Sequence, residues 1–237
     1  MIVSLDPSIT HLGWVVFDES KTGKESVKSA GVFKTDAQEG LLIQRLITQR
    51  ERVRHLLVSQ GASYVVMEAP YWSDFSTELL FALNQQLHQI FLDLKIFVVY
   101  LQPTTVKKIA LPKMKADVVT KHHMTHQAKK ELGMMGRRFS EHVADAYFVG
   151  KIGLRFYKWF FLKEIKDQDL TEAEQDLFCG KHVYTRGLKK GMTEYKGIIY
   201  RENEQFFDYR KYARNSYVIA KEIEDGGQQA LDTCRIL

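Results

Sequence analysis

The sequence has few of the residues that crosslink a chain or anchor it in a membrane. Its 237 residues include only two cysteines, Cys179 and Cys234, too few for a disulfide framework or a four-cysteine zinc site. The N-terminus shows no basic stretch followed by an apolar one, so no secretory signal is expected. The most apolar stretch, residues 143–162, is interrupted by lysine and arginine, which argues against a membrane span. These absences favour a cytoplasmic protein in a reducing compartment, with no membrane partner.

The composition is that of a folded protein. Of its residues, 45% are hydrophobic, 27% charged and 12% aromatic, which excludes a disordered chain. The formal net charge of +5 is modest, but it is unevenly distributed. Residues 107–138 contain nine lysines and arginines against two acids, a local excess of +7. This segment is the candidate surface for a polyanion.

Strand-like and helix-like segments alternate over the first 163 residues. The strand-like segments are residues 1–5, 13–17, 31–34, 64–67 and 96–101. The helix-like segments are residues 36–61, 75–94, 115–132 and 141–162. The first three strands predict an antiparallel meander, and the later alternation predicts a partly parallel sheet. The expected fold class is therefore α/β, with a mixed sheet flanked by helices.

Residues 164–237 differ from the rest and are treated as an appended C-terminal region. Turn-forming glycines are frequent there, and the hydrophobic periodicity is weaker. Residues 181–201 predict a hairpin, and residues 205–223 predict a helix.

Carboxylates stand where two of the predicted strands end. Asp6 follows the first strand and Glu68 follows a later one, so their side chains converge if the two strands are neighbours. His142 and Asp145 are three residues apart and share one face of a predicted helix. Together these side chains could hold Mg²⁺, which prefers oxygen ligands. Taken singly, each carboxylate is better explained as a solvated or capping group, and only the combination favours a metal site.

Five short motifs, taken as a set, resemble those of RuvC-type Holliday junction resolvases. In chain order they are Asp6-Pro7-Ser8 with Thr10, Gly13-Trp14-Val15-Val16, Met67-Glu68, Gln102-Pro103 with Val106-Lys107, and His142-Val143-Ala144-Asp145-Ala146. The resemblance covers residues 1–163 and implies an RNase H-like nuclease domain, with residues 164–237 as a C-terminal extension of unassigned role. It implies a homodimer that resolves four-way DNA by paired, symmetric, Mg²⁺-dependent nicks. The extension and the divergent motifs suit a phage-encoded branch, active in the cytoplasm of a bacterial or phage-infected cell.

The resemblance also implies roles for the acidic residues and His142. Asp6, Glu68 and Asp145 match the family's metal ligands, and His142 matches a fourth site that often carries aspartate. Two Mg²⁺ ions per site are expected, without a nucleotide cofactor, and the imidazole makes substitution by Mn²⁺ favourable. Two roles remain open for His142, which either binds an ion or transfers a proton of the attacking water. Ser8 stands where the family usually has glycine.

The same resemblance identifies candidate DNA-binding residues. Lys107 and Lys115 match lysines near the scissile phosphate, and Tyr71 matches an aromatic residue that stacks on bases at the opened junction. The basic patch is extended by Lys108, Lys113, Lys121, Lys129, Lys130, Arg137 and Arg138. The alternatives are a solvated helix face for the lysines and a place in the core for Tyr71.

Three other functions are compatible with these motifs. A broader debranching nuclease would cut forks as readily as four-way junctions. A non-catalytic protein would bind junctions without cutting them, although the intact acidic set argues against it. An actin-like sugar kinase or ATPase shares an Asp-Pro-Ser type of phosphate loop, but the chain is short for its two lobes.

Overall fold

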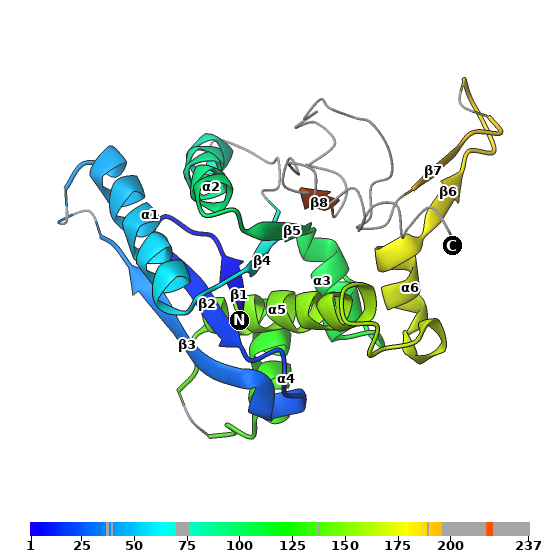
Figure 1. Ribbon diagram of the computed structural model, residues 1–237, viewed down its shortest axis with the longest axis horizontal. Helices are drawn as coiled ribbons and strands as arrows, with labels where there is room; N and C mark the ends of the chain where they lie inside the picture. The colour runs from blue at the N-terminus through cyan, green and yellow to red at the C-terminus, as the bar shows by residue number, and fades with distance from the viewer. Residues whose placement is uncertain are drawn as a thin grey trace.

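The computed structural model describes residues 1–36, 38, 40–69, 76–136, 138–188, 190–195 and 217–219. Its main sheet has six strands in the order β3-β2-β1-β4-β5-β8 (Figure 1). Their bounds are β1 Ile2–Asp6, β2 His11–Phe17, β3 Val27–Lys34, β4 Tyr64–Glu68, β5 Phe97–Leu101 and β8 Tyr217–Ile219. β1, β2 and β3 are antiparallel neighbours, whereas β1, β4 and β5 run parallel. The order 3-2-1-4-5 with flanking helices is RNase H-like and confirms the predicted fold class.

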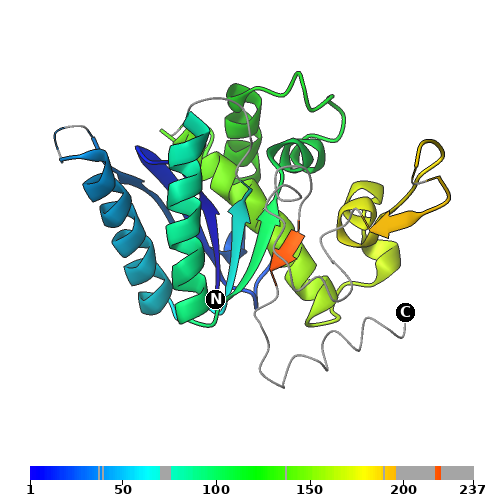
Figure 2. The same cartoon turned by 90° about the horizontal axis from the view of Figure 1, so that it is seen from above.

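Helices cover both faces of this sheet (Figure 2). Their bounds are α1 Leu42–Ser59, α2 Ser76–Asp93, α3 Pro103–Ala110, α4 Lys121–Leu132, α5 Glu141–Phe160 and α6 Glu172–Cys179, with short 3-10 helices at Gly23–Ser26 and Asp167–Asp169. α1 and α2 lie on one face, and α5 crosses the other with α3, α4 and α6 beside it. No described helix combines the length and apolar character that a membrane span requires.

The alternation of side chains along the strands separates two hydrophobic cores. On β1, Ile2 belongs to the core beneath α5, and Val3 belongs to the core beneath α1 and α2. On β4, Tyr64 belongs to the core beneath α5, and Val65 belongs to the core beneath α1 and α2. Because side chains repeat with period two, the last residues of both strands, Asp6 and Glu68, point toward the α5 face.

Glycines bring α5 unusually close to the sheet. A Cβ atom built on Gly153 would lie 2.0 Å from Cγ2 of Val66, and one on Gly150 would lie 2.1 Å from Cε2 of Phe17. Both contacts are far inside van der Waals distance, so the backbone of α5 packs directly on side chains of the strands. This close packing fixes the height of the whole helix above the sheet.

Gly153→Ala is expected to destabilise the protein, although alanine favours helices. Alanine gains about 1 kcal/mol of helix propensity over glycine. Overpacking against the stiff, buried Val66 costs about 1 to 3 kcal/mol, so we expect a net loss and a thermal midpoint lower by several degrees. The double variant Gly153→Ala/Val66→Ala should recover part of the loss. A single variant as stable as the wild type would show that this contact does not set the packing.

Elsewhere the structure confirms some predicted elements and corrects others. The five predicted strands of the first 163 residues are present, and β6 Lys181–Val183 pairs with β7 Thr193–Tyr195 as the predicted hairpin. The helix predicted over residues 115–132 begins only at Lys121, after the cap Thr120. The short helix α3 was missed. The predicted helix 205–223 is wrong at Tyr217–Ile219, which form a strand paired with β5, and the rest of that segment lies outside the described residues.

Candidate active site

Two parallel strands place Asp6 and Glu68 side by side. The register of β1 and β4 pairs Leu5 with Met67, so the next residue on each strand is Asp6 or Glu68. Both side chains face α5, and the two carboxyl groups share a hydrogen bond. The predicted convergence of the strand-end carboxylates is therefore present.

The first turns of α5 bring His142 and Asp145 to the same point. Nδ1 of His142 lies 3.1 Å from Oδ2 of Asp6, within hydrogen-bond distance. Gly13 on β2 permits this approach, because a Cβ atom there would lie 2.1 Å from the carbonyl oxygen of His142. The ring of His11 stacks on the ring of His142 with a centroid separation of 5.4 Å and an interplanar angle of 6°.

The loop after Asp6 is held by a buried side chain of α1. Nε2 of Gln49, which is 0% exposed, donates hydrogen bonds to the carbonyl oxygens of Ile9 at 3.0 Å and Phe33 at 3.1 Å. Ser8 has no positive φ, so this turn does not require the glycine that the family usually has there. The hydroxyl of Ser8 instead accepts a hydrogen bond from the backbone N–H of His11.

These residues line a cavity of about 320 Å³. Its walls are formed by Asp6, Pro7, Ser8, Glu68, Pro103, Val106, Lys107, Lys121, Met124, His142, Asp145 and Val149. Acidic groups thus lie inside the cavity, together with the lysines Lys107 of α3 and Lys121 of α4. This arrangement of carboxylates beside cations suits a bound phosphate ester with divalent ions.

Burial and mutual repulsion disfavour the charged forms of the carboxylates. Burial first, and then the charge of Asp145, raise the pKa of Asp6 from 3.8 to about 7. Burial also raises the pKa of Glu68 well above its usual value, with Asp6 adding to the effect. The hydrogen bond between the two groups lowers the pKa of Asp6 and raises that of Glu68, so Glu68 keeps the shared proton. Burial likewise raises the pKa of Asp145.

The pKa values of His142 and Lys121, which lie beside the carboxylates, are also shifted. Burial, followed by the charge of Lys121, lowers the pKa of His142, so its imidazole is neutral at neutral pH. Burial alone would lower the pKa of Lys121, but its hydrogen bond to Glu141 and the nearby carboxylates outweigh burial and raise it. The Nζ atom of Lys121 lies 3.1 Å from Oε1 of Glu141. Lys121 is therefore a permanent cation beside the acidic group.

The structure brings together part of the predicted DNA-binding set. Lys107 lines the cavity, whereas Lys115 is exposed in the segment between α3 and α4. Lys108, Lys113 and Arg138 are also exposed and do not line the cavity. Tyr71 and Arg137 lie outside the described residues. Lys121, which was predicted only as a member of the surrounding basic patch, lines the cavity itself. His11 was missed as a neighbour of the site, and the sequence gives no signal for it.

The donor set fits hard divalent ions. Among the described residues, no three His, Cys, Asp or Glu side chains already surround one point as metal ligands. Yet Asp6 and Glu68 are close enough to share a proton, and Asp145 is close enough to raise the pKa of each. A divalent cation would replace that proton and relieve the repulsion. The groups available to hold it are three carboxylates and the Nδ1 atom of His142.

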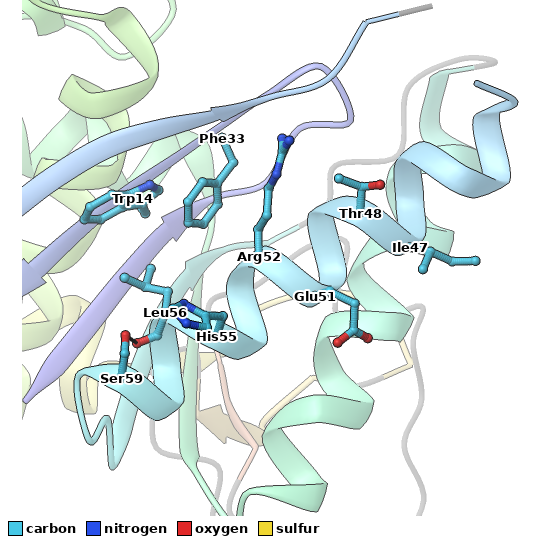
Figure 3. Close-up of a pocket in the computed structure, with 9 residues that line it drawn as sticks. All are labelled: Trp14, Phe33, Ile47, Thr48, Glu51, Arg52, His55, Leu56 and Ser59. Carbon is cyan, nitrogen blue, oxygen red and sulfur yellow. Dashed lines mark hydrogen bonds between the residues drawn. The ribbon is translucent and has the colours of Figure 1, made fainter. Parts of the chain in front are cut away.

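A second hollow of about 560 Å³ lies between α1 and the strands β2 and β3 (Figure 3). Trp14, Phe33 and Leu56 line it, together with polar side chains of α1 that include Arg52 and His55. It opens on the α1 side of the sheet, whereas the carboxylates face α5. The smaller cavity, with its carboxylates and lysines, is therefore the candidate site.

Comparison with solved structures shows where this fold occurs. The structure is similar to T. thermophilus RuvC in complex with a Holliday junction substrate, with a TM-score of 0.53 and 20% sequence identity over 68% of this chain and 95% of that one. A second T. thermophilus RuvC structure gives a TM-score of 0.52 at 20% identity over 67% and 95%. No protein-family model and no curated protein matched the sequence. The predicted likeness to RuvC is therefore confirmed at the level of the fold.

Proposed function

We propose that this chain is a Mg²⁺-dependent DNA endonuclease that resolves four-way junctions by paired symmetric nicks. It acts as a homodimer in the cytoplasm of a bacterial or phage-infected cell. The observation that carries the proposal is the meeting of Asp6, Glu68, Asp145 and His142 in one cavity of an RNase H-like sheet. The solved RuvC structure that holds a Holliday junction has the same fold, which supports this choice of substrate.

The side chains that line the cavity would bind metal ions, water and phosphate. Asp6, Glu68 and Asp145 would hold two Mg²⁺ ions through their oxygens, and bound ions of this kind activate a water and stabilise a leaving oxygen. The neutral imidazole of His142 offers Nδ1 either to an ion or to a proton of the attacking water. Lys107 and Lys121 would hold the phosphate that lies over the carboxylates.

Nick mapping on a synthetic junction tests the proposal. The full chain is incubated with Mg²⁺ and a mobile four-way junction, and cuts are mapped on all four strands. Paired, symmetric nicks that a ligase can seal are expected. Y-forks and linear duplex at equal concentration are the controls. Equal cutting of forks would favour the debranching nuclease, and binding without cutting would favour the non-catalytic protein.

Lys121→Gln and Lys115→Gln should separate a phosphate contact at the site from a contact outside it. Lys121 lines the cavity, so its loss should lower the nicking rate at saturating protein at least about tenfold. Lys115 is exposed outside the cavity, so its loss should weaken binding but leave that saturated rate close to wild type. Single-turnover nicking over a range of protein concentrations measures both quantities. Equal saturated rates in the two variants would contradict the placement of Lys121 at the phosphate.

His142→Ala should impair nicking at least about 100-fold in Mg²⁺, because both roles proposed for the imidazole are lost. The wild type should cut in Mn²⁺ at least as well as in Mg²⁺, since nitrogen ligands favour transition metals. His142→Asp should reduce this preference for Mn²⁺ if His142 is a ligand. If His142 transfers a proton, the aspartate variant should instead shift the pH profile. Near-normal cutting by the alanine variant in Mg²⁺ would remove His142 from the site.

A further inference from the structure

Hydrogen bonds between described residues continue the hairpin of β6 and β7 beyond its strands. Beyond the strands, the N–H of Tyr184 donates to the carbonyl of Met192 at 3.0 Å, and the N–H of Gly191 donates to the carbonyl of Tyr184 at 2.8 Å. A bond from the N–H of Lys190 to the carbonyl of Gly187, at 3.1 Å, closes the turn. Gly187 and Gly191 have φ angles of 76° and 85°, which strongly favour glycine. Within the described residues, the turn therefore depends on glycine at positions 187 and 191.

The base of this hairpin is anchored on α5 through α6. Phe178 of α6 is 0% exposed and packs edge-on against Phe156, with ring centroids 5.2 Å apart. It also stacks on Trp159 at 5.4 Å. Arg155 holds the buried Glu174 of α6, with Nη2 of Arg155 lying 3.1 Å from Oε2 of Glu174. The hairpin thus projects from a fixed support, and Figures 1 and 2 show it standing out to one side beyond α6.

The tip exposes basic and apolar side chains together. Residues 181–193 contain four lysines and arginines and no acid. Arg186 and Lys190 are exposed at the turn. Between them Leu188 is 108% exposed, and Met192 beyond the turn is 52% exposed. Singly exposed apolar side chains are common on protein surfaces, so the feature that points to a polyanion is the cluster of cations without an acid, with Leu188 at its centre.

We propose that this hairpin tip binds a duplex arm of the DNA substrate, away from the cleavage site. Arg186 and Lys190 contact phosphates, and Leu188 packs into the groove between them. Two-stranded ribbons fit DNA grooves, and apolar side chains at such tips wedge against sugars or base steps. The proposal rests on the proposed function, because it takes the substrate to be branched DNA.

The position of the hairpin favours duplex over the junction centre. The hairpin stands at the side of the molecule (Figure 2). The carboxylates belong to Asp6 and Glu68, the last residues of β1 and β4. The duplex arms of a four-way junction extend outward from its centre. A hairpin at the side of the protein is therefore placed to contact an arm and not the centre of the junction. The similarity to the two RuvC structures extends over 95% of each RuvC chain but only 68% and 67% of this chain. About a third of this chain therefore lies outside the similarity. The proposed contact would let this chain grip a longer part of each arm.

An arm-length series tests the proposal with Arg186→Gln/Lys190→Gln in the full chain. Junctions with short and long arms are compared by fluorescence anisotropy in Ca²⁺ at several salt concentrations. On long arms, loss of two phosphate contacts should lower the slope of log affinity against log salt by about 2. The ratio of the wild-type affinity to the affinity of the variant should then fall about tenfold between 50 and 200 mM salt. On arms too short to reach the hairpin, the variant and the wild type should bind alike.

A matched variant, Lys24→Gln/Lys95→Gln, controls for net charge. Both lysines are exposed at the end of the sheet opposite the carboxylates, so the control should keep the wild-type slope on every junction. A photoreactive side chain in place of Leu188 should crosslink to long arms and not to short ones. This second measurement does not depend on the folding of the charge variant.

The outcomes separate this proposal from the proposed function. If the wild type nicks junctions, but the hairpin variant keeps its slope and the probe at position 188 does not crosslink, the hairpin proposal is overturned alone. If the wild type neither prefers nor nicks junctions, the proposed function fails. Unchanged DNA binding with loss of binding to phosphatidylserine vesicles in the hairpin variant would instead assign the tip to an anionic membrane surface and also overturn the proposal.

Discussion

Asp6→Asn is expected to abolish nicking of a four-way junction and to leave junction binding nearly intact. The Asp6 carboxyl group contacts both Glu68 and His142, so it is the central member of the acidic group. Asparagine keeps the shape of the side chain but removes the charge that attracts a divalent ion. Metal-ion catalysis contributes several kcal/mol, so the nicking rate should fall at least about 1,000-fold. Affinity in Ca²⁺ or EDTA should change less than about threefold, because the lysines that contact phosphates are untouched.

Glu68→Gln and Asp145→Asn are expected to behave in the same way. Asp117→Asn is the matched control, since Asp117 is an exposed acid in the segment before α4 and does not line the cavity. Single-turnover nicking and anisotropy are measured for all four variants. Any of the three site variants that cuts at close to the wild-type rate must be removed from the ligand set.

Local patterns were sufficient to predict the carboxylate part of this site. Each of the strands β1 and β4 is a buried run that ends in an acid, and period two alone sets which face that acid takes. His142 and Asp145 needed only helical spacing to be placed on one face. Two long-range conditions remained, the pairing of β1 with β4 and the docking of α5 beside Asp6. The alternation of strands and helices already favoured the pairing.

The other contributors depend on long-range contacts that no local pattern encodes. Lys121 enters the cavity because α4 begins after Thr120, whereas the sequence predicted one helix from residue 115 and gave Lys115 the role at the phosphate. Nothing in the sequence distinguishes Gln49 from the other polar residues of the helix predicted over residues 36–61. Its partners, the carbonyls of Ile9 and Phe33, lie 40 and 16 residues away in the sequence. Such contacts follow only once the packing of α1 on the loop is known.

The metal-free protein is expected to lose stability as the pH rises from about 5 to 8, and Mg²⁺ should restore it. The pKa of Asp6 is raised from 3.8 to about 7 on folding, by burial first and then by Asp145. Between these two values the folded state binds more protons than the unfolded state. Its stability therefore falls as the pH rises, and the contribution is fully present only below the unfolded pKa. A shift of this size corresponds to roughly 4 kcal/mol between the two limits, of which roughly 2 to 3 kcal/mol falls between pH 5 and pH 8.

Thermal unfolding in EDTA and in Mg²⁺, followed across this pH range, measures the effect. Wild-type protein in EDTA should lose roughly 5 to 10 °C between pH 5 and pH 8, and Mg²⁺ should remove most of the loss because the ion takes the place of the proton. Asp6→Asn should be more stable than the wild type at pH 8 in EDTA, because the variant loses the charge that repels Glu68 and Asp145. Mg²⁺ should stabilise the variant far less than the wild type, because the same substitution removes a metal ligand. Asp117→Asn should follow the wild-type curves. A wild-type midpoint in EDTA that rises with pH would show that these carboxylates do not repel one another in the folded protein. A midpoint at pH 8 that does not respond to Mg²⁺ would show that they do not bind the ion.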